Sequence, residues 1–289
     1  MQNETSATIQ LDKLVFSCTS TAVNNFDEAV KNNTDLYFFQ PQFTYGNTTL
    51  TRTEDFSHRY KYSYVVSYEN NKMGQIDFGK YEFTWQDRIR FTVDNPVFYN
   101  NTQHFLSYVL KDLNLQIENY TRIDIAIDSY KFNSEQVLRK NIRNKDNQVK
   151  IFHRIIRDRT KIIDEIVYNH KGSLNNPFKI RGILIKDKKK TKEYAVYNKL
   201  EEIKYSNKDY ILEFHKTKNP NFKNIYRSES RYKYDAIKYY ENKKLNKKIT
   251  LNDLSVPEFL YTMFTYNLNS IIKIKDVCKR EIQLCQCPI

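Results

Sequence analysis

The sequence contains few residues that break or cross-link a chain: among 289 residues there are 5 glycines, 6 prolines and 4 cysteines. It has no Gly/Ser-rich linker and no repeat of fixed period, so sequence alone marks no sharp domain boundary. The cysteines do not have the spacing of a disulfide framework, which favours a reducing compartment. Cys278, Cys285 and Cys287 have neither a nearby histidine nor an obvious fourth ligand, so ordinary thiols are favoured over a zinc site.

Other absences exclude whole classes of chemistry. There is no Gly-x-Gly-x-x-Gly or Gly-x-x-x-x-Gly-Lys-[Ser/Thr] motif, so no nucleotide-cradling loop is indicated. The 5 histidines form neither a His-x-His nor a His-Glu-x-x-His pair, which disfavours histidine-based zinc catalysis. No apolar run reaches the roughly 18 residues of a membrane span, and the polar N-terminus lacks the apolar core of a signal peptide. We therefore expect a cytoplasmic protein without a membrane partner.

Aromatic residues and positive charge are abundant instead. Aromatic residues make up 15% of the chain and hydrophobic residues 40%, as in a globular protein. Residues 131–250 hold 32 Lys and Arg against 14 Asp and Glu, a net charge of +18, whereas the rest holds 15 against 20, or −5. This asymmetry favours a nucleic-acid partner, with plain surface lysine as the alternative.

The hydrophobic pattern predicts an α+β fold with a central, mainly antiparallel β-sheet and helices on one face. Strands are predicted at 60–70, 74–84, 88–94, 121–128, 149–156, 179–186, 192–198 and 224–232, with turns at 70–74 and 86–87. Helices are predicted from Asn101, over 134–144 with Asn133 or Ser134 as N-cap, over 235–241, and in the tail after Pro257. We expect a β-rich segment at 1–57, a catalytic and DNA-binding region at 58–245, and a helical tail at 246–289.

Three predicted strands carry polar residues at alternate positions: Thr121–Asp128, Glu193–Lys199 and Tyr226–Arg231. Alternate side chains of a strand share a face, so each segment has one face left for chemistry. We expect that face to be exposed. It carries Asp124, Asp128, Tyr197, Lys199, Arg227, Glu229 and Arg231.

The two aspartates need a reason to lie on a central strand, because an unpaired buried carboxylate is costly. They are four residues apart, or about 13 Å along a strand, so one ion cannot easily bind both. We choose Asp124 as a metal ligand with Glu229 as its cross-strand partner. Asp128 either supports the ligands from behind, positions DNA, or becomes a ligand itself only if the strand bulges. Mg²⁺ or Mn²⁺ suits such oxygen ligands. The alternative is a buried ion pair, for example between Asp124 and Arg227.

Together these segments resemble the plasmid rolling-circle replication initiators of the trans-acting Rep family, which is related to conjugative relaxases and filamentous-phage nicking proteins. The resemblance covers about residues 60 to 240. It rests on Arg122-Ile-Asp-Ile-Ala-Ile-Asp128, Val196-Tyr-Asn-Lys199 and Tyr226-Arg-Ser-Glu229, preceded by Arg88-Ile-Arg-Phe-Thr-Val-Asp-Asn-Pro96. It implies a nicking-endonuclease domain of the HUH-like, histidine-less kind. Arg231 departs from the pattern, because the family usually has another acid there.

The resemblance also implies residue roles. Tyr197 becomes the nucleophile that forms a 5′-phosphotyrosyl link at an origin, and Asp124, Asp128 and Glu229 become the metal-binding acids. Lys199 and Arg227 would steady the phosphate and lower the cost of ionising the tyrosine. The lysine tract would either contact phosphate or simply be solvated. The predicted DNA contacts are Lys199, Arg227, Arg231, Arg122, Lys188, Lys189 and Lys190.

The expected partners are origin DNA in single-stranded or hairpin form, a host helicase and a second copy of the chain in a homodimer. Two rival functions stay open. One is a relaxase that nicks a transfer origin during mobilisation, and the other is a non-catalytic DNA-binding protein in which Tyr197 stacks or packs.

Overall fold

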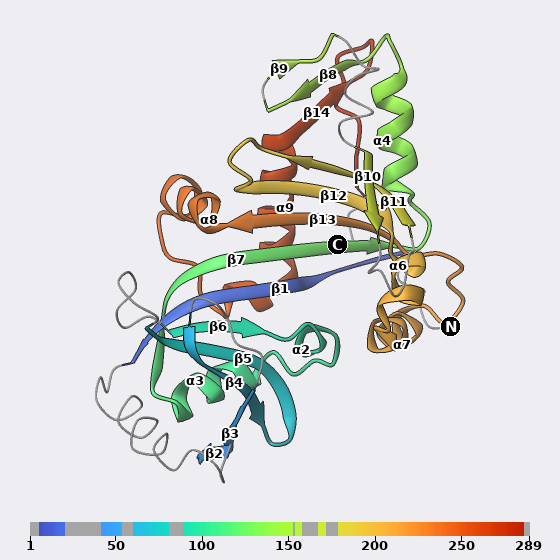
Figure 1. Cartoon of the computed structure of the whole chain (residues 1–289). Helices are drawn as coiled ribbons and strands as arrows, with labels where there is room; N and C mark the ends of the chain where they lie inside the picture. The colour runs from blue at the N-terminus through green and yellow to red at the C-terminus, as the bar shows by residue number, and fades with distance from the viewer. Residues whose placement is uncertain are drawn as a thin grey trace. The chain divides into compact units, whose positions relative to one another are not determined.

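The structure is a computed structural model that describes residues 6–20, 42–53, 60–80, 89–152, 154–157, 167–171 and 179–285 (Figure 1). Its contacts divide the chain into two units. Unit 1 comprises Met1–Asp12 with Asp124–Ile289, and unit 2 comprises Lys13–Ile123. These limits differ from the segment boundaries that the sequence predicted, at residues 57 and 245. Every predicted site residue except Arg122 belongs to unit 1.

Antiparallel β-sheet forms the framework of unit 1, which confirms the predicted α+β class. The strands lie in the order β10-β11-β12-β13-β7-β1, and β14-β8-β9 form a small second sheet. Pairing is antiparallel from β10 through β13 and throughout the small sheet. The strands are β1 (Ala7–Ser20), β7 (Leu115–Ser129), β8 (Gln148–Ile151), β9 (Arg154–Ile155), β10 (Val167–Lys171), β11 (Lys179–Lys186), β12 (Lys192–Asn198), β13 (Tyr226–Lys233) and β14 (Ile272–Lys275).

The helices of unit 1 connect these strands. They are α4 (Ser134–Arg143), α6 (Lys199–Ser206), α7 (Asp209–Lys218), α8 (Tyr234–Tyr240), a π-helical turn η1 (Glu241–Leu245), a 3₁₀ turn η2 (Asp253–Ser255) and α9 (Pro257–Ile271). Asn133 caps α4 as predicted, since its side chain accepts a hydrogen bond from the Gln136 amide. No helix among the described residues has both the length and the hydropathy that crossing a bilayer requires.

Helix α9 packs on one face of strands β12 and β13. The Tyr232 hydroxyl donates to the Met263 carbonyl, and the Asn267 amide donates to Ser230 Oγ at 2.7 Å. Because side chains alternate along a strand, Arg227, Glu229 and Arg231 point away from α9. The polar face predicted from the sequence is therefore the face opposite α9.

Unit 2 is also built on antiparallel strands, which lie in the order β1-β6-β5-β4-β3-β2. The sequence of the unit ends at Ile123, within β7, the strand next to β1. The turn between the strands Tyr60–Tyr68 and Asn71–Lys80 lies at Glu69 and Asn70, both with positive φ. The sequence predicted it at 70–74, but Asn71 already belongs to the second strand. The predicted turn at 86–87 lies outside the described residues. The elements are β2 (Gln42–Tyr45), β3 (Thr48–Arg52), β4 (Tyr60–Tyr68), β5 (Asn71–Lys80), β6 (Ile89–Val93), α2 (Pro96–Tyr99) and α3 (Phe105–Asp112).

Candidate functional site

The site is built on the pairing of β12 with β13. Tyr197 lies opposite Arg227 in the antiparallel register, and Ala195 lies opposite Glu229. Helix α6 begins at Lys199, two residues after Tyr197, because the Asn198 side chain caps it, accepting a hydrogen bond from the Glu201 amide at 3.2 Å. The predicted nucleophile therefore lies at the junction of a central strand and a capped helix.

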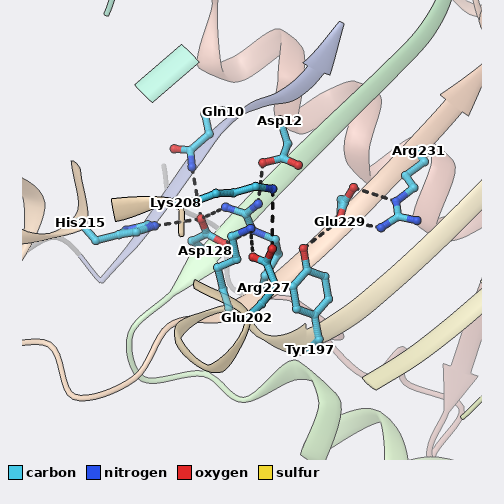
Figure 2. Close-up of polar contacts among 11 residues, drawn as sticks. Gln10, Asp12, Asp128, Tyr197, Glu202, Lys208, His215, Arg227, Glu229 and Arg231 are labelled. Carbon is cyan, nitrogen blue, oxygen red and sulfur yellow. Dashed lines mark hydrogen bonds and ion pairs between the residues drawn. The ribbon is translucent and has the colours of Figure 1, made fainter. Parts of the chain in front are cut away.

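Tyr197, Glu229 and Arg231 form a connected group on this face (Figure 2). The Tyr197 hydroxyl donates to Glu229 Oε2 at 3.1 Å. The Arg231 guanidinium donates to both carboxylate oxygens of Glu229, at 2.7 Å from Nε and 3.0 Å from Nη2. Glu229 is buried, whereas the side chains of Tyr197 and Arg231 keep part of their surface in solvent. The group thus combines a buried acid with two partly accessible partners.

Asp124 is buried on the same face and contributes to the charge balance of Arg231. Burial disfavours the charged guanidinium, but the Glu229 carboxylate outweighs it, and Tyr197 and Asp124 add to that effect. The pKa of Arg231 therefore lies above its usual value. Asp124 acts here as part of the negative surroundings of an arginine.

Arg227 and Asp128 form the second group. Arg227 donates from Nε to Asp128 Oδ1 at 2.7 Å and from Nη2 to Oδ2 at 2.6 Å, while Nη1 contacts Asp12 Oδ1 at 2.6 Å. Figure 2 also shows His215 and Gln10 against Asp128, with their Nε2 atoms 3.1 Å and 3.2 Å from Oδ2. Arg227 and Asp128 are both buried. The ion-pair alternative suggested by sequence is thus present, but with Asp128 rather than Asp124 as the partner of Arg227.

Burial alone would raise the pKa of Asp128. The charge of Arg227 and the hydrogen bonds from Arg227 and His215 outweigh burial, so the pKa of Asp128 lies below its usual value. His215 extends this group to Tyr130, whose hydroxyl lies 3.0 Å from the other ring nitrogen. Helix α7 is thereby tied to the end of β7 through a buried imidazole.

Lys199 lies beside Tyr197 but is buried in an ion pair. Its ammonium contacts the Glu202 carboxylate, and Glu202 also lies 3.6 Å from the Lys208 ammonium. Lys199 Nζ is 5.9 Å from the centre of the Tyr197 ring. Burial, aided by the charge of Arg227, lowers the pKa of Lys199. Lys199 therefore lies against the Tyr197 ring from within the protein rather than on its surface.

The phenol of Tyr197 is harder to ionise than a free tyrosine. Burial of the hydroxyl is the main cause, and the Glu229 carboxylate adds to it, so the pKa lies well above its ordinary value although Arg227 opposes the shift. Arg227 thus favours ionisation of the phenol, as predicted, but burial and the Glu229 carboxylate outweigh it. The neutral phenol donates its proton to Glu229 in a hydrogen bond.

In this arrangement the Asp128 and Glu229 carboxylates are already engaged by cationic and hydrogen-bonding side chains. The two oxygens of Asp128 accept from Arg227, His215 and Gln10, and those of Glu229 accept from Arg231 and Tyr197. A cation would have to displace an arginine to bind either carboxylate. Within the described ranges, no three His, Cys, Asp or Glu residues gather as a metal site would require. Binding of Mg²⁺ or Mn²⁺ by Asp124, Glu229 and Asp128 stays a prediction.

The lysine tract lies apart from this group. Lys188, Lys189 and Lys190 are exposed in the turn that joins β11 to β12, at the opposite end of β12 from Tyr197. The lysine tract is therefore a hairpin tip, as predicted. Arg122 belongs to unit 2 and is half-buried. The expectation of exposed acids is wrong, since Asp124, Asp128 and Glu229 are all buried.

Gly182 provides space for Tyr197 across the β11 and β12 pairing. A Cβ at position 182 would lie 2.7 Å from the Val196 carbonyl oxygen and 3.0 Å from Tyr197 Cβ. We expect Gly182→Val to push Tyr197 out of reach of Glu229, because main-chain oxygen cannot give way. Any reaction at Tyr197 should then fall by at least about tenfold, since small misplacements of reacting groups are costly. The activity of purified Gly182→Val is measured after circular dichroism has shown that its fold is unchanged.

A scan of protein-family models and a search of curated proteins give no match to this chain. A search of solved structures finds a rolling circle replication initiator protein from Geobacillus stearothermophilus. The two chains are 10% identical, the likeness covers 92% of this chain and 86% of that one, and the TM-score is 0.49. At this similarity the functional inference depends on the residues of the site itself.

Proposed function

We propose that this protein nicks and rejoins one DNA strand at a replication origin, using Tyr197 as the nucleophile, and so starts rolling-circle replication. The observation that carries the proposal is the hydrogen bond from the Tyr197 hydroxyl to the buried Glu229 carboxylate, in a partly accessible site beside Arg231. The order of the three polar strand segments in the sequence supports the same function.

In the proposed reaction the Tyr197 oxygen attacks the phosphorus of a phosphodiester while its proton passes to Glu229. The bond from phosphorus to the 3′-oxygen breaks, the leaving 3′-oxygen takes a proton from solvent water to become a hydroxyl, and a 5′-phosphotyrosyl link remains. Glu229 suits the role of proton acceptor because the phenol already donates to it. The raised pKa of Tyr197, caused mainly by burial, keeps the phenol neutral until a base takes its proton.

Arg231 has a second role in this proposal. Protonation of Glu229 removes one of the negative charges that hold the guanidinium, at the moment when charge builds up on the phosphate oxygens; the other, on Glu193, lies 3.4 Å from Nη1. Arg231, a quarter of whose side chain is exposed, can then donate to those oxygens. Attack by a 3′-hydroxyl on the phosphotyrosine reverses the steps and rejoins the strand.

The same proposal includes the substrate, partners and location expected for such an initiator. The substrate is single-stranded or hairpin DNA at a plasmid or phage origin, the partners are a host helicase and a second copy of the chain in a homodimer, and the location is the cytoplasm. A relaxase of a transfer origin would use the same chemistry. A non-catalytic DNA-binding protein would use the positive charge alone.

Covalent trapping tests the proposal. Incubation with hairpin oligonucleotides, with Mn²⁺ and with chelator in parallel, should give an adduct that survives denaturation and gel electrophoresis. Tyr197→Phe should give none, whereas Tyr194→Phe should retain it, because Tyr194 lies on the same strand but faces α9, where its ring meets Phe264 edge-on. An adduct in Tyr197→Phe contradicts the assignment. DNA binding without cleavage or trapping in the wild type favours the binding protein.

A further inference from the structure

A group of exposed tyrosines and lysines lies at the other end of strands β12 and β13. The exposed fractions of Tyr234 and Tyr239, both on α8, are 44% and 52%. Lysine ammonium groups lie over the neighbouring rings: Lys238 is 5.8 Å from the Tyr234 ring centre, and Lys192 is 5.4 Å from that of Tyr239. We call this group, with Tyr266 and Lys244, the tyrosine-lysine surface.

The rings of this surface are held in place by cations. The ammonium groups of Lys192 and Lys244 lie 5.4 Å and 5.3 Å from the centre of the Tyr266 ring. Tyr240 packs beneath it, with ring centres 5.0 Å apart. Such contacts fix a ring without covering it, because the cation lies over a single face. Tyr234 and Tyr239 therefore keep about half of their surface in solvent in fixed positions.

Further positive charge surrounds these rings. The π-helical turn η1 follows α8 directly and carries Lys243 as well as Lys244. The tip with Lys188, Lys189 and Lys190 adjoins the same strand ends, since the Lys233 amide donates to the Thr191 carbonyl at 2.9 Å. Lys238 is partly neutralised by Glu241, which lies 3.2 Å away and is itself buried. The balance remains positive, and Figure 1 shows α8 beside the end of β13.

We propose that the tyrosine-lysine surface binds single-stranded DNA, with bases stacked on Tyr234 and Tyr239 and phosphates held by the lysines. Aromatic rings interleaved with lysines suit a single strand, because its unpaired bases offer free faces that a duplex keeps within its own stack. DNA rather than RNA is inferred from the proposed function, on which this inference rests.

The surface lies on the other side of the sheet from the nicking site. Lys192 and Tyr197 are five residues apart on β12, or about 17 Å along the strand, and this odd spacing turns their side chains to opposite faces. Lys192 accordingly donates to Ser270 Oγ of α9 at 3.3 Å, whereas Tyr197 lies on the face opposite α9. The surface would therefore hold DNA outside the nicking site itself.

Fluorescence anisotropy with a labelled single-stranded oligonucleotide tests this inference, in a Tyr197→Phe background that prevents covalent capture. Tyr234→Ala with Tyr239→Ala should weaken binding about tenfold or more, since each stacked base contributes strongly. Tyr234→Phe with Tyr239→Phe should bind as the parent does, because the stacking face is kept. Tyr108→Ala, which removes a 50% exposed tyrosine from unit 2, is the matched control.

Unchanged affinity in the double alanine variant overturns the inference, and so does an equal loss in the double phenylalanine variant. Duplex DNA of the same sequence should bind the alanine variant and its parent alike. Failure of this inference is distinct from failure of the proposed function: trapping at Tyr197 reports the chemistry, and anisotropy reports the surface. If the alanine variant binds more weakly but the wild type forms no adduct, the tyrosine-lysine surface is supported and the nicking function is not.

Discussion

Arg227→Ala should destabilise unit 1 by about 3–5 kcal/mol, because it leaves a buried carboxylate without its cation. The Arg227 guanidinium makes two hydrogen bonds to Asp128 and one to Asp12. Neither Arg227 nor Asp128 has exposed surface through which water could replace these contacts. Urea unfolding followed by circular dichroism measures the change. Arg280→Ala is the matched control, since Arg280 is exposed and pairs with Asp276 at the surface.

The double variant Asp128→Asn with Arg227→Met should recover much of this loss, since it removes the pair rather than one partner.

The contribution of Asp128 to stability should depend on pH. The folded pKa of Asp128 is depressed, so its ionised form contributes stability above the unfolded pKa of about 3.9. That contribution falls as the pH drops toward the folded pKa. The difference in stability between wild type and Asp128→Asn should therefore narrow below about pH 4. Wild-type stability in Arg227→Ala would refute the structural role of this pair.

Strand periodicity predicted the parts of the site that depend on single strands. The alternation placed Glu193, Ala195, Tyr197 and Lys199 on one face, and Arg227, Glu229 and Arg231 on one face of the next strand. The structure confirms both faces within strands Lys192–Asn198 and Tyr226–Lys233, but Lys199 is the first residue of α6 rather than part of the strand. These assignments could be made because a strand has a fixed period of two.

Features that depend on how distant segments meet were not predictable in the same way. Alternation leaves open the register of β13 against β7, so sequence suggested Asp124 as the partner of Arg227 where the structure has Asp128. Asp12 is 215 residues from Arg227 in sequence. His215 lies on α7, a helix that no strong apolar pattern predicted, and no motif joins it to Asp128. Only its buried position, seen in the fold, reveals the contact.

Glu229→Gln should slow adduct formation by Tyr197 about 10²-fold to 10⁴-fold, the usual contribution of a positioned base. Glutamine can still accept a hydrogen bond from the phenol through its amide oxygen, but it cannot take up the proton. Because Gln is close to Glu in size, the fold should persist, which circular dichroism would verify. Single-turnover trapping with excess protein gives the rate. Glu193→Gln is the matched control, since Glu193 contacts Arg231 and Lys233 on the same face.

The same variant separates two roles for Glu229, proton acceptor and metal ligand. If Glu229 binds a divalent ion, trapping by the wild type should stop in chelator, and raising Mn²⁺ should restore part of the rate of Glu229→Gln. If Glu229 takes the phenol proton while Arg231 neutralises the phosphate, chelator should leave the wild-type rate largely intact and Mn²⁺ should not rescue the variant. The contacts of Glu229 with Tyr197 and Arg231 favour the second result. A Glu229→Gln variant that traps DNA at the wild-type rate would refute both roles.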